Sequence, residues 1–263
     1  MKQPDKAPLP VLITGASGGI GADLARLFAR HGHPLALVAR SGSALDALAQ
    51  ELTREGRPEP LVCALDLSSP EAPDILSAFL ASRGFCAGIL VNNAGFGLNG
   101  PVLELDGREQ INLLDLNIRA LTALTLQFLP QIVEKRGKIL NVASTAAFFP
   151  GPGMAVYYAS KAYVLSLSQS LSQELKASGV TVTALCPGPT ATGFFQRAGG
   201  KTSKLKALSM MSSVDVAEAA YRGLMAGRRI VVPGFANKLI TAAAPFVPTA
   251  LLLPIIARIQ LKT

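Results

Sequence analysis

A tyrosine and a lysine four residues apart, Tyr157 and Lys161, are the residues of this chain best suited to acid–base chemistry. On a helix, side chains at this spacing share one face, about one turn apart. A phenol has an ordinary pKa of about 10, and an ammonium group within ~4–6 Å favours the phenolate and lowers that pKa. The spacing therefore predicts a proton-transfer pair in which Tyr157 carries the proton and Lys161 tunes it. The alternative is a packed ring beside a solvated lysine.

A glycine-rich turn near the beginning of the chain is typical of a phosphate-binding loop. Val11–Ile13 is a short apolar run that predicts a buried strand, and residues 22–28 have the apolar periodicity of a helix. Between them, Gly15 permits a tight turn, Gly19 lets the backbone approach a pyrophosphate, and Gly21 allows close helix packing. The free N–H groups and the positive dipole at the helix N-terminus then favour phosphate. We expect this turn to bind a dinucleotide.

The end of the second expected strand indicates which dinucleotide is favoured. This strand covers residues 35–40 and ends at Arg40, where a site selective for NAD would carry a carboxylate against the ribose 2′-hydroxyl. An arginine favours instead the additional 2′-phosphate of NADP(H), through charge-assisted hydrogen bonds. NADP(H) is therefore the preferred cofactor and NAD(H) the alternative. The third expected strand carries Asp66, in a position suited to capping a loop near an adenine ring.

Strands and helices alternate along the chain, which predicts a parallel, doubly wound sheet with right-handed crossovers. The expected fold is thus α/β of the Rossmann type, a single domain over residues 1–236 with an apolar extension over residues 237–263. The seven expected strands are residues 11–13, 35–40, 61–67, 88–91, 138–143, 181–185 and 230–232. The expected helices after the first are residues 41–56, 70–83, 105–135, a helix carrying Tyr157 and Lys161, and residues 214–226.

The polar and glycine-rich segments of this pattern follow the strands. Ligands of such sheets bind outside the carboxyl ends of the strands, and Arg40 and Asp66 lie at two of those ends. Asn92–Gly95 follows another strand, and small and amide side chains there can satisfy exposed backbone and line a crevice. Ser144 and residues 187–192 follow two more. The convergence of these segments, rather than any single motif, predicts a ligand site at this edge of the sheet.

The glycine turn, the segments after the strands and the Tyr157–Lys161 pair occur in the order typical of the short-chain dehydrogenase/reductase family, which the chain resembles over roughly residues 10–195. The resemblance implies an NAD(P)(H)-dependent oxidoreductase that reduces the carbonyl group of a small molecule or oxidises the corresponding alcohol. Similar apolar tails occur in the NADP(H)-preferring branch of long-chain 3-oxoacyl and hydroxysteroid reductases, which indicates a lipophilic substrate. The matching motifs are Thr14-Gly-x-x-x-Gly-Ile-Gly21, Asn92-Asn-Ala-Gly95, Asn117, Ser144, Tyr157-x-x-x-Lys161 and Pro187-Gly-x-x-x-Thr192.

The resemblance implies a role for each matching residue. Tyr157 would donate a proton to the carbonyl oxygen as hydride arrives from the nicotinamide, and Ser144 would polarise that oxygen. Lys161 would bind the nicotinamide ribose and lower the pKa of Tyr157, and Asn117 would hold a water that links Lys161 to solvent. Tyr158 is a competing acid without the spacing to Lys161. The implied cofactor-binding residues are Gly15, Ser17, Gly19, Ile20, Gly21, Arg40, Asp66, Asn93, Ala94, Gly95, Tyr157, Lys161, Pro187, Gly188, Thr190 and Thr192.

Two segments near the carboxyl end are candidates for contact with the substrate. Residues 193–212 are flexible and basic in composition and correspond to the substrate lid of the family, although a solvated loop would have the same composition. Residues 239–257 are nearly all apolar but are interrupted by three prolines, Pro245, Pro248 and Pro254. Three alternatives stay open for this tail: a flap on the substrate cleft or on a partner subunit, a peripheral membrane contact through residues 239–263, and a membrane span.

Composition narrows the range of partners. The chain of 263 residues carries a net charge of +8 without a lysine- or arginine-rich run interleaved with aromatic residues, so no nucleic acid is expected. The three cysteines and two histidines lack metal-ligand spacing, and no metal is expected. The family commonly forms homo-oligomers through the helix over residues 105–135 and the Tyr157 helix, which implies a dimer or tetramer here.

A cytoplasmic location is expected, with membrane association as the alternative. Two other functions fit the same sequence. One is a binding protein that senses NADP(H) without turnover, and the other is a membrane-tethered reductase of lipids or steroids.

Overall fold

The computed structural model describes residues 7–194, 198 and 210–261. At its centre is a parallel sheet of seven strands in the order β3-β2-β1-β4-β5-β6-β9. The α/β fold predicted from the alternation of strands and helices is therefore confirmed, with every expected strand present. The strands are β1 (Val11–Thr14), β2 (Leu35–Ala39), β3 (Leu61–Ala64), β4 (Ile89–Asn92), β5 (Lys138–Val142), β6 (Thr181–Leu185) and β9 (Ile230–Val231).

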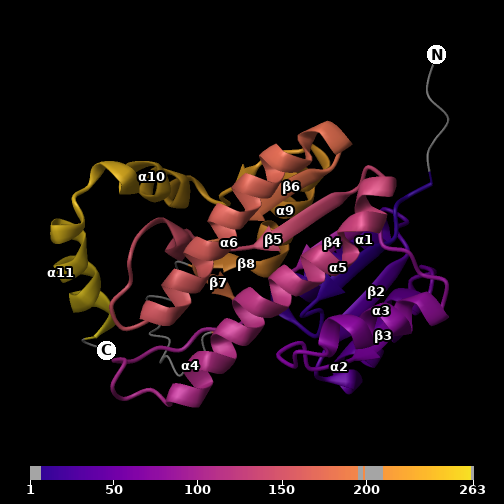
Figure 1. Cartoon of the computed structure of the whole chain (residues 1–263), viewed down its shortest axis with the longest axis horizontal. Coiled ribbons are helices and arrows are strands. Elements are labelled where there is room, and N and C mark those ends of the chain that lie inside the picture. The colour runs from indigo at the N-terminus through magenta and orange to yellow at the C-terminus, as the bar shows by residue number, and fades with distance from the viewer. Residues whose placement is uncertain (1–6, 195–197, 199–209, 262–263) are drawn as a thin grey trace.

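Helices cover both faces of this sheet (Figure 1). Successive residues of a strand point to opposite faces, so a strand buried on both sides is apolar throughout. In β1, Val11 and Ile13 pack in one cluster with α1, α2 and α9, while Leu12 packs in another with α3 and α5. The helices of the core are α1 (Gly19–Arg30), α2 (Gly42–Arg54), α3 (Ala72–Ser82), α4 (Gly107–Leu114), α5 (Leu121–Glu134), α6 (Ala155–Glu174) and α9 (Ser213–Met225).

The strand order reverses between β1 and β4. The chain runs from β1 outward through β2 to β3, and then returns to the other side of β1 for β4, β5, β6 and β9. The loops that leave β1 and β4 consequently diverge and open a crevice at the carboxyl ends of these strands. The glycine turn follows β1, and the Asn92–Gly95 motif begins at the last residue of β4 and continues beyond it, so the two motifs face each other across the reversal point.

The helix expected over residues 105–135 is not one uninterrupted α-helix. Asp115–Ala120 forms a π-helical segment between α4 and α5. Such a segment carries an extra residue within a helix and is frequent at functional sites. It contains Asn117, whose side chain is almost completely buried. The apolar periodicity of the sequence revealed the helix but not this local change in its hydrogen bonding.

A second, two-stranded parallel sheet was not expected from the sequence. It pairs β7 (Thr190–Ala191) with β8 (Met211–Ser212). A capping interaction precedes α9, because Ser212 Oγ accepts a hydrogen bond from the backbone N–H of Asp215 and donates to its carboxylate. The greater part of the expected substrate lid, residues 195–197 and 199–209, lies outside the described residues.

The apolar tail folds as two helices joined by a short turn. These are α10 (Phe235–Ala243) and α11 (Thr249–Gln260), with Pro245 and Pro248 in the segment between them. Pro254 lies inside α11, so the expectation that all three prolines interrupt the tail is wrong for this one. Within the described part of the chain, no helix has both the length and the apolar character that crossing a bilayer requires.

Candidate active site

The glycine turn has a backbone geometry that side chains would disturb. Gly15 and Gly19 have φ of +66° and +53°, the left-handed region that favours glycine. A Cβ on Gly21 would lie 2.3 Å from the carbonyl oxygen of Gly15, so the first turn of α1 is in close contact with the loop that precedes it. A Cβ on Gly18 would meet no atom within 4 Å. The turn therefore keeps its backbone exposed to the cleft, as the sequence predicted.

Hydrogen bonds hold the glycine turn against the loop after β4. Asn93 Nδ2 donates to the carbonyl oxygens of Thr14 and Gly15, at 2.9 and 3.0 Å. Thr14 Oγ1 accepts from the backbone N–H groups of Asn93 and Ala94, both at 3.0 Å, and donates to Val91 O. These bonds join two segments almost eighty residues apart and fix the walls of the crevice where the strand order reverses.

Tyr157 and Lys161 lie together on the buried face of α6. Lys161 Nζ is 5.8 Å from the centroid of the Tyr157 ring, and both side chains are buried. Lys161 Nζ also donates a 2.8 Å hydrogen bond to the carbonyl oxygen of Val142, the last residue of β5. The four-residue spacing thus brings the phenol and the ammonium group to one side of the helix, at the carboxyl edge of the sheet.

Ser144 lies near Tyr157, in the segment that follows β5. It follows β5 by two residues, and its Oγ accepts from the backbone N–H of Ala146 at 3.1 Å. Ser144 also hydrogen-bonds the phenol of Tyr157, which favours the phenolate and lowers its pKa. A serine hydroxyl and a phenol therefore share one polar site, in the arrangement that polarisation of a carbonyl oxygen requires.

The pKa shifts of this pair differ from the sequence-based expectation. Burial raises the pKa of Tyr157 to about 12, and it outweighs the opposing hydrogen bond from Ser144. Burial also lowers the pKa of Lys161 to about 8, and it outweighs an opposing electrostatic contribution from Cys186. The expectation that the pKa of the phenol is lowered is therefore wrong in this structure. Spacing along a helix does not reveal how deeply the two groups are buried, and burial decides the direction.

Asn117 lies behind the cleft rather than in its wall. Its Nδ2 donates to Phe96 O and to Ser160 Oγ, and its Oδ1 accepts from the backbone N–H of Phe96. Ser160 Oγ in turn donates to the carbonyl oxygen of Tyr157. Both N–H donors and the oxygen of the buried amide thus have partners, and the side chain connects the π-helical segment with the loop after β4 and with α6. Its expected contact with a water remains a prediction.

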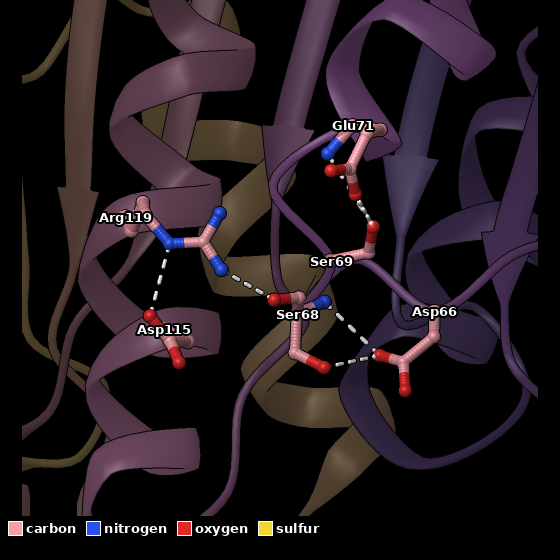
Figure 2. Close-up of polar contacts among 6 residues, drawn as sticks. All are labelled: Asp66, Ser68, Ser69, Glu71, Asp115 and Arg119. Carbon is pink, nitrogen blue, oxygen red and sulfur yellow. Dashed lines mark hydrogen bonds and ion pairs between the residues drawn. The ribbon is translucent and has the colours of Figure 1, made fainter.

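Arg40 and Asp66 lie at the opposite end of the cleft from Tyr157. Arg40 is exposed at the end of β2. Asp66 Oδ1 accepts from the backbone N–H and the hydroxyl of Ser68, so it caps its own loop as expected. Figure 2 shows how Arg119, on the π-helical segment, bonds both Ser68 O and Asp115 and so anchors this loop to the helix layer. The loop that contains Asp66 is therefore held by hydrogen bonds within it and by the bond from Arg119.

The segment after β6 closes the cleft over the glycine turn. Thr192 approaches that turn closely, because a Cβ on Gly19 would lie 2.9 Å from the Thr192 methyl group. Thr190 Oγ1 donates to Gly188 O at 2.9 Å, which orders the bend between β6 and β7. Gly188 in turn lies against the Asn237 side chain of α10.

All the predicted site residues except Gly21 and Asn117 line one cavity of about 760 Å³. Gly21 instead packs against the backbone of Gly15 in the turn, and Asn117 forms hydrogen bonds with Phe96 and Ser160 behind the cleft. At the end of the cavity beyond Tyr157, the structure adds residues that the motifs did not reveal. The added lining residues discussed below are Phe96, Met154, Tyr158, Phe194 and Gln260.

A comparison with family models agrees with this arrangement. A model described as short chain dehydrogenase matches residues 10–202, which contain the glycine turn, Ser144, Tyr157 and Lys161. The chain belongs to the short-chain dehydrogenase family. The resemblance expected from the motifs is therefore confirmed, and the match reaches slightly further than the residues from which the resemblance was inferred.

Individual relatives of this short-chain dehydrogenase differ in their described activities. The chain is 34% identical to the very-long-chain 3-oxoacyl-CoA reductase of Bos taurus over 69% of its own length, and the match covers 59% of that protein. A short-chain dehydrogenase from Sphingobium yanoikuyae in complex with NADPH is 36% identical, with a TM-score of 0.80 over 93% of this chain and 95% of the other.

The bulky-bulky ketone specific alcohol dehydrogenase from Comamonas testosteroni is 32% identical in sequence to this short-chain dehydrogenase. Its TM-score is 0.76, over 92% of this chain and 94% of the other. The structural agreement therefore extends over most of the chain.

We expect substitution at two glycines of the turn to have different effects. Gly21→Ser should lower the free energy of unfolding by about 1–3 kcal/mol, because its side chain would overlap Gly15 O and force the turn to move. Gly18→Ser adds the same side chain where no atom lies within 4 Å, and serine is a favourable residue at this helix N-cap. Urea denaturation of both variants measures the difference. Equal losses would show that the turn is not as closely packed as described.

Proposed function

We propose that this short-chain dehydrogenase uses NADP(H) to reduce the carbonyl group of a lipophilic small molecule, or to oxidise the corresponding alcohol. The observation that carries the proposal is that Ser144, Tyr157 and Lys161 meet in a cleft whose other end is the glycine turn. A general acid, a hydrogen-bonding hydroxyl and a buried ammonium group in one cleft are suited to proton transfer at a carbonyl oxygen.

The other end of the cleft fits a dinucleotide. Its glycines leave backbone N–H groups accessible at the N-terminus of α1, where phosphate is favoured. Arg40 is exposed at the end of β2, and no ion pair with an acidic residue is found for it among the described residues. It is therefore available to a 2′-phosphate. When bound, the nicotinamide nucleotide supplies the hydride. The NADPH complex of the Sphingobium yanoikuyae relative supports this assignment.

In the proposed reaction Tyr157 holds the proton for the carbonyl oxygen. With a pKa of about 12 the phenol is protonated at neutral pH, so it is ready to donate in the direction of reduction. Ser144 orients the same oxygen through its hydroxyl. Lys161, fixed by Val142 O, contributes positive charge beside the phenol while it is protonated. Asn117 holds the loop and the helix that position these groups.

The apolar lining beyond Tyr157 supports a lipophilic substrate. The ring of Phe194 lies 5.3 Å from that of Tyr157, and Phe96 and Met154 pack in the same cluster. Such a surface gains free energy by contact with apolar groups and offers little to a charged molecule. The described activities of the Bos taurus and Comamonas testosteroni relatives, on very-long-chain acyl and on bulky ketone substrates, agree with this class.

We expect Tyr157→Phe to abolish reduction and to preserve nucleotide binding. The ring stays in its packed position, but no proton is available, and loss of a general acid costs about 10²–10⁴-fold in rate. The measurement is NADPH oxidation with a lipophilic ketone, together with NADPH binding by fluorescence. Tyr163→Phe, on the exposed face of the same helix, is the matched control. A Tyr157→Phe variant with unchanged turnover would refute the proposed acid; a wild-type protein that binds NADPH without turnover would favour the sensing function.

We expect Arg40→Asp to shift the cofactor preference toward NADH. Loss of a charge-assisted hydrogen bond, and repulsion between the new carboxylate and the 2′-phosphate, should lower the NADPH/NADH ratio of kcat/KM by about 10–100-fold. Arg222→Asp makes the same change of charge on the exposed face of α9 and should leave the ratio unchanged. If the two variants have the same ratio, Arg40 does not bind the 2′-phosphate.

The lowered pKa of Lys161 predicts the pH dependence of reduction. The ammonium form is present below a pH of about 8 and is lost as the pH rises through that value, so kcat/KM should fall above it. The stability effect has the opposite sign, because between about 8 and the ordinary value of 10.5 the unfolded chain binds a proton that the folded chain has lost. In that interval the free energy of unfolding should rise with pH.

Lys161→Met separates the two effects. At neutral pH the variant should be inactive yet more stable than the wild type by roughly 3 kcal/mol, at about 1.4 kcal/mol per pKa unit of burial-induced shift. This difference in stability should disappear above the ordinary lysine pKa of 10.5, because Lys161 of the wild type is then uncharged in both the folded and the unfolded state. Denaturant titrations at several pH values measure it. If the variant is less stable than the wild type at every pH, burial of the Lys161 charge does not destabilise the folded protein.

A further inference from the structure

The carboxyl-terminal helix reaches the substrate end of the cleft. Figure 1 shows α10 and α11 beyond the end of α6, with the last turn of α11 returning toward the segment that precedes α6. In that turn Gln260 Nε2 donates a 2.6 Å hydrogen bond to Tyr158 Oη, although 102 residues separate them. Both residues line the cavity next to Tyr157. Gly153 allows this approach, because a Cβ there would lie 3.0 Å from Leu261 and 3.3 Å from Gln260.

The two partners of this hydrogen bond are held to very different extents. The Tyr158 ring lies against Gly151, where a Cβ would come within 2.4 Å of it, and its centroid is 5.9 Å from that of Phe149. In contrast, no residue of α11 with a described side chain is fully buried, and Leu251 and Ile255 are 61% and 56% exposed. The hydrogen bond therefore connects a fixed tyrosine with a helix that the core does not hold.

We propose that Gln260 is a specificity-determining residue, which rests on the function proposed above. Through Tyr158 it holds the last turn of α11 as the end wall of the substrate cleft, and this wall limits the length of the carbonyl compound. The wall lies next to the reacting end, since the rings of Tyr158 and Tyr157 are 6.1 Å apart. The remaining lining from Phe96, Met154 and Phe194 is apolar, so the substrate class is apolar ketones short enough to fit beneath α11.

The hydrogen bond between Gln260 and Tyr158 contributes to the strength of the wall. Such a bond contributes a factor of roughly three to ten in an equilibrium, so a longer chain can displace α11 only at that cost. Gln260→Leu and Tyr158→Phe both remove the bond and keep the approximate size of each side chain. Each should raise kcat/KM for a long-chain methyl ketone relative to butanone about three- to tenfold, through a lower KM for the long ketone. The double variant should shift no further than either single variant, because the two share one bond.

The experiment follows NADPH oxidation by the full chain with a homologous series of methyl ketones. Ile255→Ala, exposed on the same helix, is the control and should leave the ratio unchanged. Wild-type turnover with an unchanged ratio in both variants would overturn the end wall and leave the proposed function standing. NADPH binding without turnover of any ketone would overturn both. Lower stability without a change in the ratio would show that the bond is only structural.

Discussion

The central constraint on this structure is the burial of the Lys161 ammonium group beside the Tyr157 phenol. Removing a charge from water is unfavourable, which is why the pKa of the lysine is lowered to about 8. The carbonyl oxygen of Val142, at the end of β5, provides the hydrogen bond that holds it. A surface pair would be screened by water and would have little influence on its neighbour. The position of α6 against the sheet edge therefore decides whether the pair can do chemistry.

Polar side chains fix the positions of the loops at this edge of the sheet. Thr14 and Asn93 bond the loops after β1 and β4 to each other, where parallel strands diverge and no further backbone ladder is available. Asn117 does the same behind the site, between the π-helical segment, the loop after β4 and α6. Buried amides are unfavourable unless their hydrogen bonds are made, so each restricts its neighbours to one arrangement. This restriction gives the cleft the fixed geometry that proton transfer needs.

The substrate end follows a different principle. The nucleotide end is built from loops held by the sheet, whereas the far wall includes the last turn of an apolar helix that buries little of its own surface. Contacts with few buried atoms have low local stability and can open without unfolding the domain. The same fold thus combines closely packed residues around Tyr157 with a carboxyl-terminal helix that buries little of its surface.

The sequence alone determined the α/β fold, the family and most of the candidate site, because these depend on local patterns. Apolar runs and helical periodicity place the strands and helices, and the carboxyl ends of parallel strands necessarily meet at one edge. The tertiary structure decided what depends on burial and on contacts distant in sequence. It reversed the expected pKa shift of Tyr157, revealed the π-helical segment around Asn117, and brought Gln260 to Tyr158. No local spacing encodes the depth of a side chain or a contact across a hundred residues, since both arise only when separate elements pack.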